Sequence, residues 1–130
     1  MKPLCPEGWP RPKGYSNAMA ARGRVVFTAG VVGWNDEEKF VETSLAGQFA
    51  QTLRNILAIL ACDGAGPQSI ARLTCYVTSI EEYRASLTEI GEAWKAIIGR
   101  HYPAMALVEV VRLVEPEAKV EIEATAVVPE

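Results

Sequence analysis

The stretch HYPAMALVEVVRLVEPEAKVEIEATAVV, residues 101–128, determines how the rest of the chain is arranged. It predicts two strands joined by a turn over residues 114–118, because Pro116 cannot donate to a ladder and its acidic neighbours favour water. Side chains of a strand alternate between two faces. In the second strand one face is apolar and comprises Val120, Ile122, Ala124, Ala126 and Val128; the other comprises Lys119, Glu121, Glu123 and Thr125. Glu121, a carboxylate in an otherwise apolar neighbourhood, is the first candidate for chemistry.

Two amphipathic helices are predicted upstream. The first is opened by Thr43 or Ser44 as N-cap, carries an apolar stripe at intervals of three and four residues, and ends before Gly64 and Pro67. A capping box, Ser79 to Glu82, opens the second, which carries Tyr83, Leu87, Ile90, Trp94, Ile97 and Ile98 on one stripe.

Four further strand segments are predicted. Residues 24–29 and 70–78 alternate with a period of two, while residues 15–20 and 39–41 are shorter extended pieces. Gly30 and Gly33 bracket two valines, which indicates a bulge or a close backbone approach. The predicted fold is α+β, a two-layer sandwich of two helices on one mixed sheet.

Two helices can cover one face of this sheet. The opposite face is predicted to carry Val26, Tyr76, Met105 and Leu107, which is too apolar to stay in water. Self-association is the simplest way to cover it, and would place Glu121 near a subunit boundary.

Length and composition limit the function classes. With 130 residues the chain forms one domain over residues 15–130, preceded by a proline-rich arm over residues 1–14. A net charge of −3 without a basic run disfavours nucleic acid and anionic membrane surfaces as partners. Three cysteines at unrelated spacings fit no disulfide framework, and the absence of a signal-like or 18-residue apolar run predicts a cytoplasmic protein.

Two groups of residues could be catalytic, and each could instead have a purely structural role. His101, the only histidine, could pair with Cys75 or Cys62 as a nucleophilic dyad, or could be a loop histidine at a helix end. Glu121 and Glu123 share a strand face about 6.5–7 Å apart, which suits acid–base chemistry or a solvated face beside Lys119. No phosphate loop, Rossmann fingerprint or HExxH-type metal motif occurs.

Several short motifs resemble the Rid (YjgF-type) reactive-intermediate deaminase family along nearly the whole chain, from Pro12 to Val128. They are PKGYS at 12–16, VFTAG at 26–30, YVT at 76–78, YPA at 102–104 and VEIEA at 120–124. The resemblance implies a chorismate-mutase-like homotrimer with three small-molecule clefts between subunits. It also implies hydrolysis of imines and enamines such as 2-aminoacrylate to a keto acid and ammonia, without metal or organic cofactor.

The resemblance also implies roles for individual residues. The family glutamate that matches Glu121 positions or activates water, the tyrosine that matches Tyr15 lines the cleft, and backbone near Gly30 helps to hold the substrate. In the family an arginine after the Pro-Ala dipeptide clamps the substrate carboxylate. Here Ala104 matches, but Met105 replaces the arginine, and Ala106 and Leu107 replace small or polar residues.

Methionine cannot make the paired charge-assisted hydrogen bonds of a guanidinium. The cleft is therefore predicted to suit a neutral or more apolar ligand, lined by Met105, Leu107 and Trp34, and activity on 2-aminoacrylate is not expected. The first hypothesis is a Rid-like hydrolase with a non-standard substrate. The second is a non-catalytic trimer that binds a small metabolite, and the third, disfavoured by the acidic balance, is an endoribonuclease or translation inhibitor.

Overall fold

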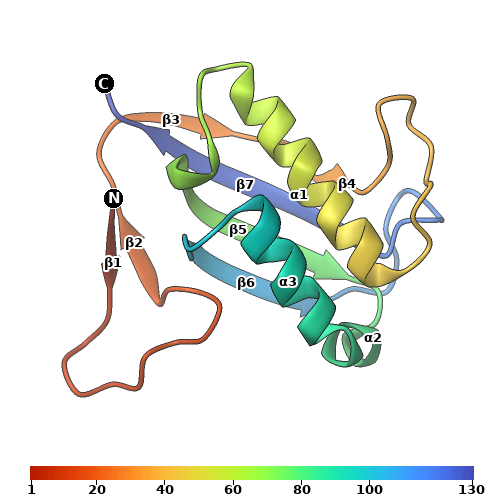
Figure 1. Cartoon of the computed structure of the whole chain (residues 1–130), viewed down its shortest axis with the longest axis horizontal. Coiled ribbons are helices and arrows are strands. Elements are labelled where there is room, and N and C mark those ends of the chain that lie inside the picture. Colours follow the sequence, from red (N-terminus) through yellow and green to blue (C-terminus); the bar gives the residue numbers. More distant parts are fainter.

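One mixed five-stranded sheet organises the computed structural model, which describes all 130 residues (Figure 1). Its strand order is β3-β7-β5-β6, and β4 also pairs with β7. The strands are β3 (Arg24–Phe27), β4 (Val31–Val32), β5 (Ile70–Val77), β6 (Ala104–Glu109) and β7 (Val120–Val128). The helices are α1 (Leu45–Ala61), α2 (Ile80–Ala85) and α3 (Leu87–Ile97), with a 3₁₀ turn η1 (Pro67–Ser69). A separate ribbon pairs β1 (Lys2–Leu4) with β2 (Ala18–Ala20).

The last two strands do not form a hairpin, and that expectation was wrong. β5 lies between them: β6 runs parallel to β5, whereas β7 runs antiparallel to it. β6 also ends at Glu109, so that a ten-residue segment, 110–119, is available to cross over the intervening strand. β6 is therefore an edge strand of the sheet, with β5 as its only strand partner and an isolated bridge from Ala104 to Ser16 on its other side.

Helix α1 forms as predicted. The Ser44 hydroxyl accepts a hydrogen bond from the Gly47 amide and caps the first turn. The predicted stripe faces the sheet, where Phe49, Leu53 and Ile56 are at most 1% exposed. Gly64 then adopts the left-handed conformation, with φ of 72°, that ends the segment. Residues 39–41, predicted as a short extended strand, join no sheet.

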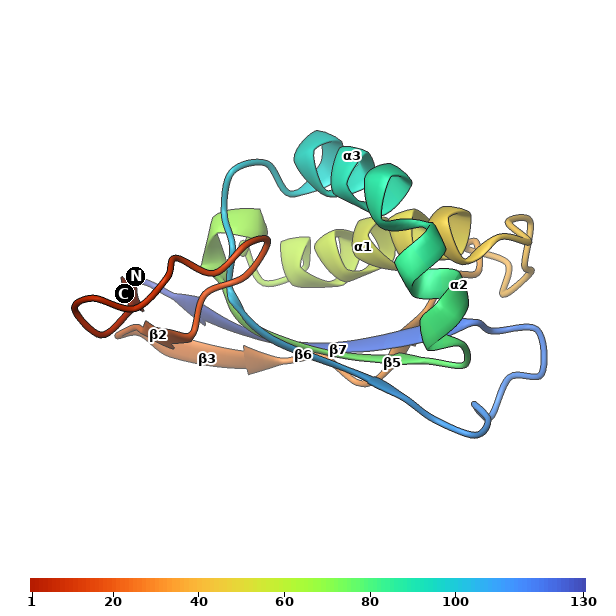
Figure 2. The ribbon, with the colours of Figure 1, turned by 90° about the horizontal axis from the view of Figure 1, so that it is seen from below.

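The second predicted helix is two helices. Ser79 caps α2 by accepting from the Glu82 amide, as the capping box predicts. At Ser86 the backbone leaves helical geometry (φ −105°, ψ 9°), and the Ser86 hydroxyl donates to the Glu82 carbonyl. The stripe is consequently divided: Ile90, Trp94 and Ile98 are buried, and Leu87 is 52% exposed. Three helices thus lie on one side of the sheet (Figure 2).

The other side of the sheet, called the open face below, carries no helix (Figure 2). Of the residues predicted there, only Tyr76 is present. The register pairs Met105 with buried Leu73, Leu107 with Cys75, and Val26 with Ala126, which places all three on the helix-covered side. The open face is apolar through other residues, namely Val25, Phe27, Ala106 and Val108. Both faces of β6 are apolar in sequence, so a period of two could not show which one meets the helices.

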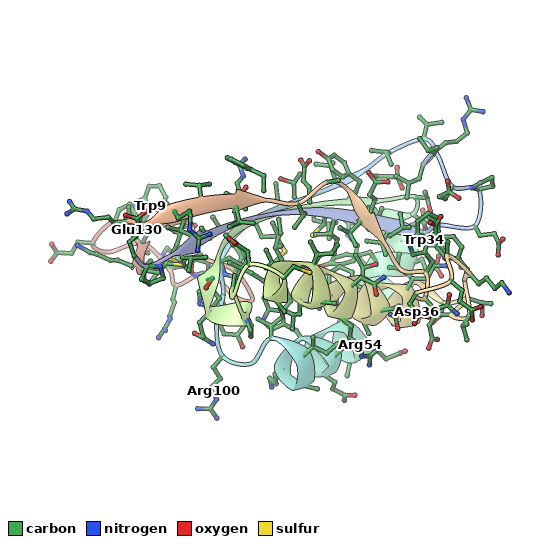
Figure 3. All side chains as sticks on the ribbon, turned by 90° about the horizontal axis from the view of Figure 1, so that it is seen from above. Trp9, Trp34, Asp36, Arg54, Arg100 and Glu130 are labelled. Carbon is green, nitrogen blue, oxygen red and sulfur yellow. The ribbon has the colours of Figure 1, made fainter.

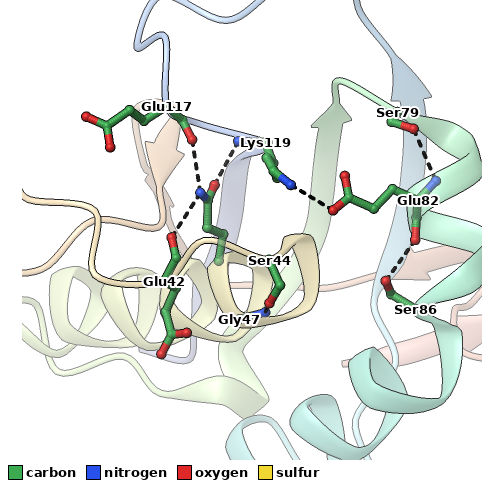
Figure 4. Close-up of polar contacts among 9 residues, drawn as sticks. Glu42, Ser44, Gly47, Ser79, Glu82, Ser86, Glu117 and Lys119 are labelled. Carbon is green, nitrogen blue, oxygen red and sulfur yellow. Dashed lines mark hydrogen bonds and ion pairs between the residues drawn. The ribbon is translucent and has the colours of Figure 1, made fainter.

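A buried glutamine fixes the start of β7 (Figure 4). Gln48 on α1 is 1% exposed, and its amide nitrogen donates to the Glu42 and Glu117 carbonyls while its oxygen accepts from the Lys119 amide. Lys119 also pairs with Glu82 at 2.8 Å. These bonds attach the turn before β7 to two helices and thereby set the position of Glu121, two residues later.

Side chains fill the layer between α1 and the sheet (Figure 3). Trp34 lies at the end of the molecule away from Glu130 and packs against Phe40, with ring centroids 5.8 Å apart. None of the three helices combines the length and the apolar character needed to cross a membrane.

Candidate functional site

The predicted site residues form two groups on opposite sides of the sheet. Gly30 and Glu121 meet on the open face, whereas Tyr15, Met105 and Leu107 line a pocket on the helix-covered side. Ala104 and Ala106 lie on the open side of edge strand β6, in register with Arg72 and Thr74.

Glu121 is half-buried in the middle of the sheet. Its register partners are Tyr76 on β5 and Val32 on β4. Its carboxylate lies directly over the backbone of Gly30: a Cβ atom at residue 30 would stand 2.2 Å from Glu121 Oε2. The close backbone approach predicted for this glycine is thus confirmed, and the approaching group is the candidate catalytic carboxylate itself.

Gly30→Ala is expected to displace this carboxylate while leaving the fold intact, because the colliding atoms belong to the end of a flexible side chain. A displacement of about 1 Å at a reacting group can reduce turnover about a hundredfold. The measurement is the rate of the imine hydrolysis that the family resemblance implies, beside the thermal unfolding midpoint. A variant with full activity would show that the position of Glu121 does not depend on Gly30.

Glu123 has a different environment from Glu121. It is exposed, and the Tyr76 hydroxyl donates to its Oε1 over 2.9 Å. That hydrogen bond, followed by burial and the charges of Glu123 and Glu121, raises the pKa of Tyr76 above its usual value. Tyr76 therefore stays a neutral donor committed to Glu123, and Glu121 is the carboxylate of this pair that is left free to act on a ligand.

The pocket on the helix-covered side, called the α3–β6 pocket below, has a volume of about 460 Å³. Buried Phe49, Ile90 and Trp94 form its floor, and Met105 and Leu107 form its β6 wall. The remaining lining residues are Lys13, Gly14, Tyr15, Tyr83, Leu87, Gly91, Lys95 and Tyr102. Trp34, predicted to line the cleft, is not among them, because it lies in the loop after β4.

Aromatic contacts and backbone bonds keep this pocket in shape. Trp94 stacks on Tyr102 with centroids 6.3 Å apart and planes 9° from parallel, and its indole N–H donates to the His101 carbonyl. Burial raises the pKa of the Tyr83 phenol, which stays protonated near neutrality. Ser16 donates to the Pro103 and Tyr102 carbonyls and so holds neighbouring Tyr15 at the pocket mouth.

Sequence reasoning missed Tyr83, Trp94 and Tyr102 as pocket residues. The first two belong to the stripe of the second predicted helix, where aromatic side chains normally indicate core packing. The break at Ser86 places Tyr83 on α2 and Trp94 on α3, and both side chains line the pocket. A serine inside a helical pattern was the one available signal.

No hydrogen bond joins His101 to Cys75 or to Cys62, whose thiol donates to the Ala58 carbonyl instead. His101 Nε2 lies 2.6 Å from the Ile70 carbonyl, so it donates there and joins the loop after α3 to β5. Burial raises the pKa of the Cys75 thiol to about 12, which keeps it protonated and unreactive. No cluster of three or more His, Cys, Asp or Glu side chains is placed to hold a metal ion.

Comparison with known proteins gives a consistent result. The family model for endoribonuclease L-PSP matches residues 10–128. The 2-iminobutanoate/2-iminopropanoate deaminase of Escherichia coli is 31% identical over 105 residues, covering 81% of this chain and 80% of the relative. A RutC family protein of Pyrococcus horikoshii is 31% identical over 122 residues and 92% of both chains. A crystal structure of the Rid family protein YyfB of Yersinia pestis superposes with a TM-score of 0.83, at 32% identity over 98% of both chains.

Proposed function

Because this chain belongs to the endoribonuclease L-PSP family, the YjgF/Rid proteins, we propose that it hydrolyses reactive imines and enamines at a cleft between two copies of the chain. The observation that supports this most directly is the carboxylate of Glu121, held against the Gly30 backbone on an uncovered sheet face and free of the hydrogen bond that occupies Glu123. A relative named as a deaminase of 2-iminobutanoate and 2-iminopropanoate supports the same reaction class.

The proposed reaction needs water and one acid–base group. Glu121 takes a proton from water as the oxygen attacks the C=N carbon and passes that proton to the nitrogen, which gives a carbinolamine. Glu121 then takes the proton of the carbinolamine hydroxyl and passes it to the nitrogen as the C–N bond breaks, so that a carbonyl compound and ammonia leave. An enamine enters this sequence after tautomerising to the imine. No atom changes its oxidation state in this hydrolysis, so the reaction needs no redox partner.

The two groups of site residues lie on opposite faces of one sheet, so within one chain they cannot line a single cleft. A cleft that contains both Glu121 and the α3–β6 pocket must combine the open face of one copy with the pocket of another. The expected assembly is a homotrimer with three such clefts, and the exposed Phe27 and Val108 of the open face would be covered in it.

Light scattering at micromolar concentration is therefore expected to give three times the 14.1 kDa chain mass. Phe27→Glu, which puts a charge on a side chain that is 75% exposed in the single chain, should weaken the assembly without unfolding the subunit. A monomeric wild type would contradict both the trimer and the shared cleft.

The substrate is expected to differ from 2-aminoacrylate, because Met105 in the pocket wall offers no donor to a carboxylate. The same observation favours a second candidate function, a trimer that binds an apolar metabolite without turnover. The discriminating experiment measures ammonia release over a panel of imines as a function of pH, with Glu121→Gln as control.

Ribonuclease activity, which the family description names, is not proposed, since the chain is acidic and the open face carries Glu121 and Glu123.

A further inference from the structure

The α3–β6 pocket combines an apolar interior with two positive charges. Within one chain, Lys13 and Lys95 are its only charged lining residues; in the proposed assembly the single carboxylate added to the cleft is Glu121 of the neighbouring copy. Neither lysine forms an ion pair: the two ion pairs of the chain join Arg24 to Asp63 and Lys119 to Glu82. Two uncompensated ammonium groups beside one pocket create a local positive potential that favours an anion.

The lysines come from separate segments. Lys13 precedes Tyr15 in the N-terminal arm, and Lys95 lies in the last turn of α3. Both are exposed, whereas the floor residues Phe49, Ile90 and Trp94 are between 1% and 6% exposed. The charges therefore stand at the rim and the apolar contacts lie below them, which is an arrangement for an amphipathic ligand with one anionic end.

We infer that the pocket binds a carboxylate with an apolar or aromatic body, held by Lys13 and Lys95 at the rim and with its body against Trp94, Tyr102 and Leu107. A volume near 460 Å³ is within the range of small-molecule sites and fits one aromatic ring with a short chain. The inference rests on the proposed function for its substrate class: the imine of a large apolar or aromatic amino acid. A three-carbon acid has no apolar body to pack against these residues, so Lys13 and Lys95 are not expected to replace the missing arginine for such substrates.

The test uses a stable pair of probes, 3-phenylpropanoate and the uncharged 3-phenylpropanamide, titrated calorimetrically into the full-length protein at low ionic strength. The carboxylate is expected to bind more tightly than the amide, and 0.3 M salt should remove most of the difference. Lys13→Gln and Lys95→Gln should each weaken carboxylate binding about two- to fivefold, and the double variant about tenfold. Amide binding should not change.

Lys39→Gln is the matched control, since Lys39 is exposed and lies outside the pocket lining; it should leave both affinities unchanged. Equal binding of the two probes, no binding of either, or carboxylate affinity insensitive to both lysines would overturn the inference. The assay needs no turnover. Carboxylate binding with the expected lysine dependence but without ammonia release from any imine would support the inference and overturn the proposed hydrolysis.

Discussion

Glu121→Gln is expected to reduce imine hydrolysis by about a hundred- to ten-thousandfold, the usual contribution of a positioned general base. The amide keeps the shape of the carboxylate against Gly30 but cannot accept a proton from water at neutral pH. Because residue 121 is half-buried and its side chain points away from the core under the helices, folding and assembly should persist. The measurement is the rate of ammonia release at saturating substrate, beside the mass of the assembly.

Glu123→Gln is the matched control on the same strand. A glutamine oxygen can still accept the Tyr76 hydrogen bond, so this variant should keep most of the activity. An equal loss from Glu123→Gln alone would mean that Glu123, supported by Tyr76, is the catalytic carboxylate. Full activity of Glu121→Gln would remove the proposed mechanism altogether.

The sequence was sufficient for those parts of the fold that local chemistry determines. The helix caps at Ser44 and Ser79 and the period-two pattern of β7 are confirmed, since each depends on neighbouring residues; the second half of the capping box is not formed, because the Glu82 carboxylate pairs with Lys119. The order of the strands in the sheet could not be predicted from neighbouring residues. That β5 lies between β6 and β7 depends on long-range pairing, and a turn-like segment at residues 114–118 is compatible with a hairpin and with a crossover.

The residues of the candidate site were predicted one by one from the family resemblance. That they would be divided between the two faces of the sheet was not predicted. The register of β6 against β5 places Met105 and Leu107 under the helices and Glu121 above the sheet. In sequence, AMALV offers apolar side chains on both faces, so only tertiary contacts decide between them. The pocket itself depends on the break at Ser86 and on the N-terminal segment bound to Pro103, two features without a periodic signal.

Met105→Arg is expected to confer measurable hydrolysis of 2-aminoacrylate, about tenfold or more above wild type. Met105 lies in the wall of the α3–β6 pocket, below the rim lysines, and arginine has comparable reach with a forked donor for a small carboxylate. Met105→Gln is the matched control, similar in length but uncharged, and should give no gain. Formation of pyruvate and ammonia is followed for wild type and both variants, together with the mass of the assembly.

The gain should be incomplete and should lower stability. Ala106 and Leu107 supply no polar groups to orient the substrate, and an orientation error near 1 Å can reduce the rate about a hundredfold. The new guanidinium would also be half-buried near Lys13 and Lys95; no acid of the same chain lines the pocket, and in the proposed assembly only Glu121 of the neighbouring copy could neutralise the added charge. A lower unfolding midpoint that recovers on adding a carboxylate ligand is therefore expected. A Met105→Arg variant that keeps the wild-type assembly mass but gains no activity would show that more than one residue prevents this cleft from acting on 2-aminoacrylate. Strong wild-type activity on 2-aminoacrylate would instead show that another group already holds its carboxylate, and the rim lysines would then be the first to replace.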